Sequence, residues 1–522
     1  MRSDVPLRFG TKFSKNTVCP VAPRLISFIF LCCITFSPSG FAATDWSDEI
    51  LYFVLIDRFA DGDSSNNYKI ERTNPGGFHG GDLKGLTQRL DELSELGVTA
   101  LWINPVQKQM AECPYANAPA KMGLPEFKHC GFHGYWIDDF STMDAHFGNI
   151  DDLKNLVAEA HKRNIKVLLD VVYNHAAYSS SYGARRTSDR QNWLRTGEGN
   201  CEVDPIKCAV GGLPDFKTEL PEVRDFLLDA NIALAKQAGV DGFRLDTYKH
   251  VESEFWLEHR KRTRVEVDPN FFLLAEYWGG TANSLDSFFE RDEIDSGFDF
   301  GFKGSCESFV NGRGRAVAYG SYLGSRHKVR KGYLMAHYLS SHDEPMALSN
   351  LGGDKDKFRI CAAIQMTSIG LPVIYYGEEV ARGGSEWPLN RNNMPWGERD
   401  IKPGKGIVRD ELMRAFYKSL LQIRKLHPAL RHGEYTMLSA PQDKVLSYIR
   451  EDVASNDKVL VLVNRETQEI TANVKLPDTW GEKFARDEMS RAEMLIAAGR
   501  VELVIAPKSV RILSIGSGKV TH

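Results

Sequence analysis

Residues 223–246 read VRDFLLDANIALAKQAGVDGFRLD, and this stretch contains one complete step from a helix to a strand. Its first part, 223–238, places apolar side chains at helical spacing, which predicts an amphipathic helix. The short apolar run GFRLD at 242–246 follows almost at once and is typical of a buried strand. A helix joined to a strand by so short a connection is the repeating unit of a parallel α/β fold.

The same alternation extends in both directions from about residue 50. Further helices are predicted over 82–96, 151–163 and 354–368. Eight strands alternating with helices predict a parallel (β/α)8 barrel. The strands are expected at residues 51–57, 100–104, 166–172, 242–246, 272–276, 294–300, 333–340 and 372–376.

Two gaps between the expected strands are longer than ordinary βα loops. We therefore expect inserted loops at 105–135 and 176–220, and the second is a candidate subdomain. The expected organisation is a barrel over 43–429 followed by a β domain over 430–522. The β domain is predicted from β-rich segments with turn residues between them, at 445–449, 459–464, 470–474 and 510–515.

The N-terminal segment, residues 1–42, is expected to be a signal peptide. Basic residues precede the apolar run 25–36, and Gly40 and Ala42 fit a cleavage site. The run is short for a membrane span, so a signal anchor is the alternative. Cleavage predicts a secreted or periplasmic protein with no membrane contact afterwards.

The composition is ordinary for a globular protein, with 42% hydrophobic and 26% charged residues. A formal net charge of −4 gives no electrostatic argument for nucleic acid as a partner. Export permits disulfides, although spacing alone leaves free thiols as the alternative. We expect two local disulfides and two packed thiols: Cys113–Cys130, Cys201–Cys208, and Cys306 with Cys361.

Two carboxylates stand at the ends of apolar strands. In GFRLD, Arg244 and Asp246 point the same way because strand side chains alternate. A carboxylate beside a guanidinium stays ionised, as a nucleophile must, although a structural Arg–Asp pair is the alternative. Glu276 ends the run in LLAEYW, where the rings of Tyr277 and Trp278 favour a protonated general acid. A capping or surface glutamate is the alternative.

Polar clusters recur at the ends of two further strands. YLSSHDE ends with His342 and Asp343, and LLDVVYNH carries Asp170, Asn174 and His175. Barrel enzymes place their active sites at the carboxyl ends of the strands. Chance would scatter such clusters over both ends, so four clusters at one end predict an active site.

In order, DVVYNH, GFRLDTYKH, LLAEYW and SSHDE resemble the four sequence regions of glycoside hydrolase family 13, the α-amylase family. The resemblance covers nearly all of the chain after the signal segment. It implies a (β/α)8 TIM barrel, an inserted domain B at about 176–220 and a C-terminal antiparallel β-sandwich. It also implies that Asp246 is the nucleophile, Glu276 the general acid/base and Asp343 the third carboxylate that orients the sugar.

The resemblance implies a binding site for an α-glucan such as starch or a maltodextrin. FHGYW resembles the loop whose tyrosine, here Tyr135, stacks under the reacting sugar, and PLNRNN supplies Arg391. The acidic partner usual before this arginine is displaced, because Glu386 sits one residue further away than the pattern expects. The other implied sugar contacts are Arg244, His175 and His342, with Lys249 and His250 on the leaving-group side.

Calcium is the cofactor that the resemblance implies, and calcium prefers oxygen ligands. The main site would use Asn174, Asp215 in GLPDFK and the carbonyl of His250. A second candidate resembles a calcium loop of cyclodextrin glucanotransferases and neopullulanase-like members, with a metal-free Asx-rich turn as the alternative. Its ligands would be Asp61, Asp63, Asn66, Asn67, the Gly80 carbonyl and Asp82.

The expected function is retaining endo-hydrolysis of α-1,4-glucosidic bonds in starch and maltodextrins, as in an α-amylase, by a monomer. A cyclomaltodextrinase, neopullulanase or transglycosylase of the same family is the alternative. Cyclodextrin glucanotransferases carry extra C-terminal domains, and cyclodextrinases usually carry an N-terminal domain and an MPKL-like stretch where this chain has LPDF, which favours an α-amylase. An inactive glucan-binding homologue would usually lack a catalytic carboxylate, and all three are present.

Overall fold

The computed structural model describes residues 45–116, 123–195, 197, 199–326, 329–438 and 444–516. These residues belong to one compact unit, Thr44–His522. The expected signal peptide, residues 1–42, lies outside the described residues. None of the described helices combines the length and the apolar character that crossing a membrane requires.

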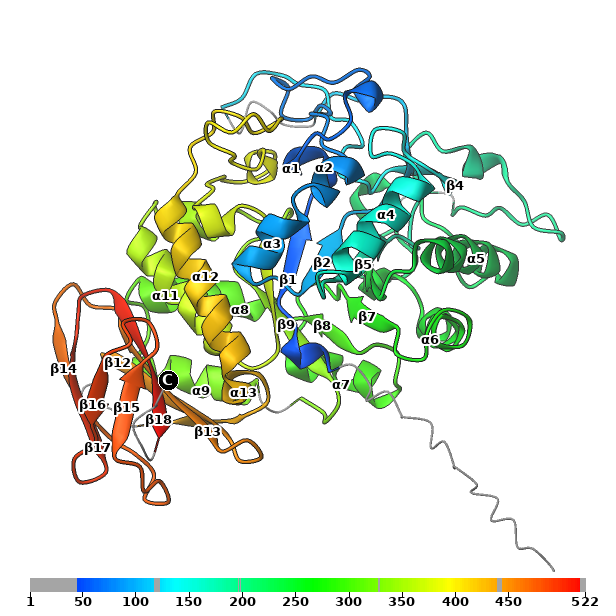
Figure 1. Cartoon of the computed structure of the whole chain (residues 1–522). Helices are drawn as coiled ribbons and strands as arrows, with labels where there is room; N and C mark the ends of the chain where they lie inside the picture. The colour runs from blue at the N-terminus through cyan, green and yellow to red at the C-terminus, as the bar shows by residue number, and fades with distance from the viewer. Residues whose placement is uncertain are drawn as a thin grey trace, which may run out of the picture. The chain divides into compact units, whose positions relative to one another are not determined.

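Eight parallel strands close into a barrel in the order β1-β10-β9-β8-β7-β6-β5-β2 (Figure 1). Every predicted barrel strand is present, and the (β/α)8 fold is confirmed. Apolar side chains fill the interior: Phe53 of β1 and Trp102 of β2 stack with ring centroids 3.6 Å apart. The strands are β1 (Leu51–Val54), β2 (Ala100–Ile103), β5 (Lys166–Val171), β6 (Gly242–Leu245), β7 (Phe272–Ala275), β8 (Ser296–Phe298), β9 (Leu334–Tyr338) and β10 (Leu371–Tyr375).

Helices connect the barrel strands. The helix predicted over 82–96 is two helices, because Arg89 leaves helical geometry at φ −105° and ψ 3°. In α5, Pro221 stands in the first turn and Gly239 ends the helix at φ +74°, a conformation that glycine adopts without strain. The helices are α1 (Ile56–Phe59), α2 (Leu83–Thr87), α3 (Leu90–Leu96), α4 (Ile150–His161), α5 (Pro221–Ala238), α6 (Ser253–Glu266), α7 (Ala282–Glu290), α8 (Gly301–Val310), α9 (Ala316–Ser325), α10 (Ala347–Asn350), α11 (Lys355–Thr367), α12 (Glu411–Leu426) and α13 (Pro428–Arg431).

Two segments extend the carboxyl end of the barrel. The first contains an antiparallel pair that the sequence did not predict, β3 (Gln107–Gln109) with β4 (Ile137–Met143). These strands are short or largely polar, so they lack the apolar run by which the barrel strands are detected. The second segment, 176–220, contains short 3-10 turns and returns to the barrel through a bridge between His175 and Asp215.

The cysteines are arranged as predicted. Cys113–Cys130 and Cys201–Cys208 are disulfides, one in each inserted segment. Cys306 of α8 and Cys361 of α11 are buried thiols. Each disulfide therefore closes a loop that lies at the carboxyl end of the barrel.

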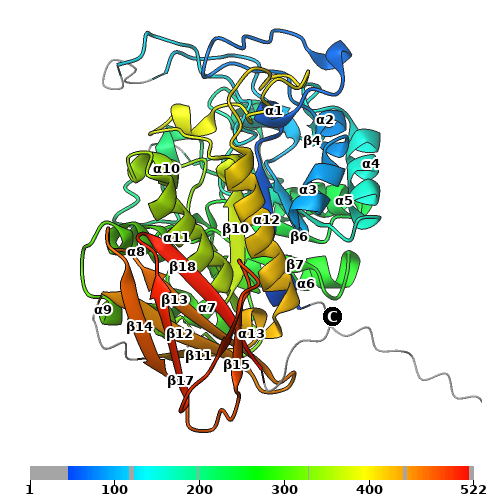
Figure 2. The same ribbon diagram turned by 60° about the vertical axis from the view of Figure 1, so that its left-hand side comes forward.

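The C-terminal part is an antiparallel β domain, as predicted. A six-stranded sheet has the order β11-β12-β13-β18-β15-β16, and β14 pairs with β17. Its sheets enclose an apolar core that includes Leu460, Leu462 and Leu513. Figures 1 and 2 show these strands beside α9, α11 and α13. The strands are β11 (Glu434–Met437), β12 (Val445–Asp452), β13 (Asp457–Asn464), β14 (Ile470–Lys475), β15 (Phe484–Asp487), β16 (Glu493–Leu495), β17 (Arg500–Ile505) and β18 (Ser509–Gly516).

Candidate active site

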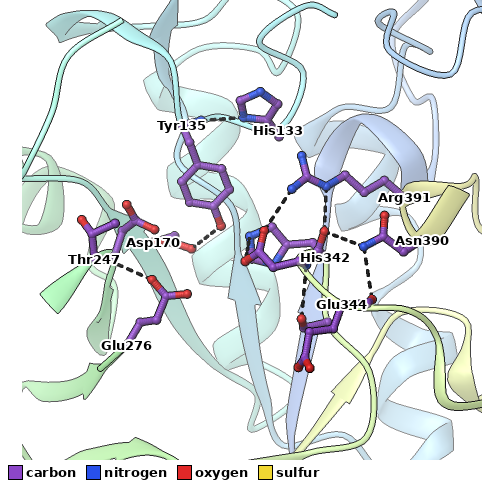
Figure 3. A network of polar contacts seen from close by, with 12 residues as sticks. His133, Tyr135, Asp170, Thr247, Glu276, His342, Glu344, Asn390 and Arg391 are labelled. Carbon is purple, nitrogen blue, oxygen red and sulfur yellow. Dashed lines mark hydrogen bonds and ion pairs between the residues drawn. The ribbon is translucent and has the colours of Figure 1, made fainter. Parts of the chain in front are cut away.

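The barrel geometry brings the predicted polar residues together at one end (Figure 3). Asp246 and Glu276 each follow directly on a strand of the barrel, β6 and β7. The Asp246 N–H donates to the carbonyl of Val171 at 3.0 Å, and the Glu276 N–H donates to the carbonyl of Leu245 at 3.0 Å. These bonds continue the strand ladder, so the backbone of the barrel fixes the origin of both carboxylates.

Arg244 lies at the centre of the site and is 1% exposed. Its Nη1 donates to Asp246 Oδ1 at 2.7 Å and to Asp170 Oδ1 at 3.0 Å. Its Nη2 is 2.5 Å from Glu276 Oε1. One guanidinium therefore holds three carboxylates, so Arg244 and Asp246 form more than the isolated pair that was the alternative.

The negative charge around Arg244 exceeds the positive charge. Burial raises the pKa of Glu276 to about 8 even though Arg244 acts in the opposite direction. Burial likewise raises the pKa of Asp170 to about 7 against the effect of Arg244. Thr247, which follows Asp246, donates its N–H to Glu276 Oε2 at 2.9 Å. Glu276 can therefore retain a proton near neutral pH, as an acid catalyst must.

Asp343 is held from the opposite side of the site. Arg391 Nη2 donates to its Oδ1 at 3.1 Å, and His342 Nε2 lies 3.2 Å from its Oδ2. Burial raises the pKa of Asp343, but His342 and Arg391 outweigh it and the pKa lies below its ordinary value. Glu386 is exposed, and Arg391 uses Asp343 as its carboxylate partner.

Three predicted sugar contacts converge on the aromatic side of the site. The Tyr135 ring stacks with the His342 ring at 5.2 Å between centroids and 16° between planes. The Tyr135 hydroxyl donates to Asp170 Oδ2 at 2.8 Å, which fixes the tilt of the ring. His175 Nε2 lies 3.1 Å from the Tyr135 carbonyl. His342 and Asp170 therefore fix the orientation of the Tyr135 ring.

Lys249 and His250 follow β6, and His250 contacts the inserted segment 176–220. Lys249 Nζ lies 5.6 Å from the centroid of the Tyr277 ring. His250 Nδ1 lies 2.6 Å from the carbonyl of Pro205. Burial lowers the pKa of His250, which favours the neutral ring.

The three residues predicted for the main calcium site converge. The Asn174 side-chain amide lies 3.2 Å from Asp215 Oδ1 and 2.9 Å from the carbonyl of His250. The amide oxygen faces these two acceptors, so either a cation lies between the three oxygens or the amide is turned over and its NH2 group donates to both acceptors. Arg195 Nε donates to the other carboxylate oxygen of Asp215 at 2.6 Å. Burial raises the pKa of Asp215 to about 7 despite that arginine.

The residues of the second candidate calcium loop also lie near one another. Asp82 accepts the N–H groups of Gly62 and Asp63 and caps α2, which satisfies its carboxylate within the protein. Asp61 Oδ2 accepts a bond from Asn67 Nδ2 at 2.8 Å. Its other partner is Arg72 at 3.0 Å, and Lys84 pairs with Asp63. The amide oxygens of Asn66 and Asn67 are buried without a protein partner. The Asn67 oxygen lies over Gly80.

Some residues of the site were not predicted from the sequence. Trp102 Nε1 donates to Asp170 Oδ2 at 2.9 Å, yet in the sequence it is only an apolar strand residue. Asn390 Nδ2 donates to the carbonyls of His342 and Glu344 at 2.8 and 3.1 Å. Its place beside Arg391 in PLNRNN was the available signal. The floor beside Glu276 and Trp278 is aromatic and includes Phe298, Phe300 and Tyr338.

Comparison with known families identifies the catalytic part. The family model described as the α-amylase catalytic domain matches residues 53–202 and 206–411. The chain belongs to glycoside hydrolase family 13. The model described as the maltogenic amylase C-terminal domain matches residues 435–512, which lie in the C-terminal β domain. The chain is therefore a glycoside hydrolase of the α-amylase family.

Individual relatives differ in their named activities. A cyclomaltodextrinase from Bacillus sp. is 30% identical, with 88% of this chain and 80% of that protein covered. The crystal structure of an Anoxybacillus α-amylase has a TM-score of 0.78 at 25% identity, covering 92% of this chain and all of the other. The crystal structure of CldA, a cyclomaltodextrin glucanotransferase with a three-domain ABC distribution, has a TM-score of 0.75 at 26% identity. The match covers 89% of this chain and 99% of the CldA chain. A chain with a single C-terminal domain can therefore be a glucanotransferase, so the domain count does not separate the family members.

Proposed function

We propose that this chain hydrolyses α-1,4-glucosidic bonds in cyclic and short linear maltodextrins, with retention of configuration, as a cyclomaltodextrinase-type enzyme. The observation that carries the chemistry is the binding of Asp246 and Glu276 to the two terminal nitrogens of Arg244. A retaining mechanism needs its two carboxylates roughly 5–5.5 Å apart, and binding to one guanidinium keeps these two near each other. The cyclomaltodextrinase relative supports the choice of substrate over endo-hydrolysis of starch.

In the first step, an Asp246 oxygen attacks the anomeric carbon as the bond to the leaving oxygen breaks, and Glu276 gives that oxygen its proton. Arg244 holds Asp246 through a hydrogen bond of 2.7 Å, and burial raises the pKa of Glu276 to about 8, which favours its protonated form at neutral pH. In the second step, Glu276 takes a proton from water, whose oxygen displaces Asp246 from the anomeric carbon. Both carboxyl groups return to their starting protonation states.

The surrounding residues hold the sugar in this proposal. Tyr135 stacks under the reacting glucose, and Asp343 orients its hydroxyls while Arg391 holds Asp343. His175, His342 and Arg244 would bind the same glucose. Lys249 and His250 would contact the sugars of the leaving group. Remote contacts of this kind accelerate the reaction when they fit the transition state better than the substrate.

We propose calcium as a structural ligand at the Asn174 site. Two side-chain oxygens and the His250 carbonyl converge there, and oxygen donors of these kinds are the ones that calcium prefers. Bound calcium would supply positive charge and join the barrel to the segment 176–220. The loop 61–82 is a weaker candidate, because its carboxylates already have N–H or cationic partners, although the orphan oxygens of Asn66 and Asn67 fit a cation.

Endo-hydrolysis of starch is the second candidate function. It is favoured by the Anoxybacillus α-amylase, whose whole chain is matched. We also propose export to the periplasm or the medium, which the two disulfides support because such bonds persist in oxidising compartments. A monomer remains our proposal for the oligomeric state, and light scattering tests it.

Chromatography of the products from β-cyclodextrin, pullulan and soluble starch tests the proposed function. We expect β-cyclodextrin to be cleaved at the highest kcat/KM. Faster cleavage of starch into long products would favour the α-amylase candidate. Absence of hydrolysis on all three substrates would contradict the enzyme assignment and favour a glucan-binding role. Proton NMR of the first product should show the α-anomer, and an initial β-anomer would contradict retention.

A further inference from the structure

The disulfide loop 201–208 contacts His250, a residue of the proposed leaving-group site. The carbonyl of Pro205 lies 2.6 Å from His250 Nδ1. Cys208 is buried, with Sγ 4.0 Å from the same nitrogen. The bond Cys201–Cys208 closes this loop over the imidazole. The ring of His250 therefore takes its orientation from the loop.

This contact determines which ring nitrogen carries the proton. A carbonyl oxygen can only accept a hydrogen bond, so His250 Nδ1 must carry the hydrogen that it donates to Pro205. In the neutral ring Nε2 then has a free lone pair and can only accept. Within the described part of the chain no residue bonds to Nε2. This nitrogen is therefore available to accept a hydroxyl of a bound sugar.

The loop is held together by its own contacts. Asp204 Oδ1 accepts the N–H groups of Ile206 and Lys207 at 3.0 and 3.1 Å. Gly199, at φ +64°, lies so close to Lys207 that a Cβ atom would come within 2.4 Å of its carbonyl. The α-amylase family model matches residues 53–202 and 206–411, so the segment that supplies the carbonyl lies between the matched ranges.

We propose that the disulfide loop 201–208 is a positioning element that fixes His250 as a hydrogen-bond acceptor for the first sugar of the leaving group. The inference rests on the proposed function, because it assigns a role within the same reaction. Without the disulfide, the loop would no longer be tied across the imidazole, so Pro205 would hold Nδ1 less firmly and the ring could rotate or exchange tautomers. Binding of a leaving sugar would then weaken, while cleavage of a substrate without such a sugar would not.

Two substrates separate this role from general stability. When β-cyclodextrin is cleaved, the leaving group is a glucose residue with its hydroxyls. When 4-nitrophenyl α-maltoside is cleaved at its aryl bond, the leaving group is 4-nitrophenol, which has no sugar hydroxyl. For C201S/C208S we expect kcat/KM on β-cyclodextrin to fall about tenfold, the size of one hydrogen bond. Release of 4-nitrophenol should stay within about twofold of the wild type. The matched control is C113S/C130S, which removes the disulfide of the other inserted segment and should change both rates by the same factor.

A double-mutant cycle tests the coupling. In His250→Asn the side-chain amide can still donate to Pro205, but the acceptor at the Nε2 position is lost. We expect this variant to lose about tenfold on β-cyclodextrin, and the addition of C201S/C208S to cost nothing more. A further tenfold loss in the combined variant would overturn the proposal, since the loop would act without His250. Melting temperatures confirm that each variant is folded.

The outcomes distinguish the two proposals. A wild-type chain that cleaves neither substrate contradicts the proposed function and the inference with it. If the wild type is active and C201S/C208S loses the same factor in kcat/KM on both substrates, the inference is overturned and the proposed function stands. Unchanged rates on both substrates in that variant also overturn it.

Discussion

Two clusters of buried charge in this molecule are balanced in opposite ways. In the active site, Arg244 faces three carboxylates. At the junction of the barrel and the C-terminal sheet, Arg424 and Arg450 are fully buried and donate only to backbone carbonyls. Among the described residues, neither of these arginines has an ion-pair partner, since the contacts of both go to backbone carbonyls.

The difference shows in the pKa values. Burial raises the pKa of Glu276 to about 8, within reach of a proton donor at neutral pH. Burial lowers the pKa of Arg424 to about 9 and of Arg450 to about 10, so both remain charged at neutral pH. The active site thus contains a carboxyl group, Glu276, that can exchange its proton near neutral pH. The junction contains two arginines that stay charged and bond to uncharged backbone carbonyls. We expect substitutions in the first cluster to change activity and substitutions in the second to change stability.

The largest effect is expected for Glu276→Gln. The amide cannot protonate the leaving oxygen, and general acid–base catalysis contributes 10²–10⁴-fold, so kcat should fall by about 10³-fold. The folded-state pKa of Glu276 is raised, so its ionised form opposes folding above the unfolded pKa, and the neutral amide should raise the melting temperature at pH 9. Initial rates on β-cyclodextrin and thermal melts measure both. Undiminished hydrolysis would remove Glu276 from the mechanism.

The second effect concerns the junction. Arg424 bonds to the carbonyls of Met366, Ser368 and Gly370, and Arg424→Met leaves them unsatisfied. Each buried carbonyl left without a donor costs about 1–3 kcal/mol. The free energy of unfolding should therefore fall by on the order of 3 kcal/mol or more. At a temperature where the variant is folded, kcat should stay close to the wild-type value. A large fall in kcat without a loss of stability would contradict the division between the two clusters.

The sequence predicts the first cluster far better than the second. Asp246, Glu276 and Asp343 end apolar strands within recognisable motifs, and strand alternation already places Arg244 beside Asp246. Arg424 lies in a helix as one basic residue among many, and its burial depends on how the C-terminal sheet packs on the barrel. Long-range packing of that kind leaves no local pattern.

The same reasoning explains what was missed inside the site. Trp102 contributes one N–H bond from an apolar strand, and no periodicity reveals that bond. The strands β3 and β4 are detected only through their pairing, because neither has an apolar run. Residue types at strand ends were therefore predictable, whereas bonds between distant segments were not.

A chelator should separate the two candidate calcium sites. Calcium that binds only the folded state raises the free energy of unfolding by about 2.7 kcal/mol when its concentration is about a hundred times its dissociation constant. Excess EGTA should therefore lower the melting temperature of the wild type. Asp215→Asn should abolish this response, because it removes the anionic oxygen that faces Asn174. The matched change in the other loop, Asp61→Asn, should leave most of the response. No effect of EGTA on the wild type would eliminate calcium at both sites.

The smallest effect is expected at His427, which joins the two domains by charge. Its Nδ1 lies 2.9 Å from Asp457 and its Nε2 3.9 Å from Glu488. Burial lowers the pKa of His427, but these carboxylates outweigh it and raise the pKa to about 9. A raised folded-state pKa means that the stabilisation is complete below the unfolded value of about 6.5 and disappears as the pH rises through 9.

His427→Gln should therefore cost about 1–2 kcal/mol at pH 6 and little at pH 10. The control is His161→Gln, which breaks a pair with Asp241 on a side chain that is 44% exposed and should cost less than about 0.5 kcal/mol at either pH. Urea unfolding at the two pH values gives these differences. Equal losses at pH 6 and pH 10 would show that His427 acts through packing, and the junction would then depend on its buried arginines for its charge-based stability.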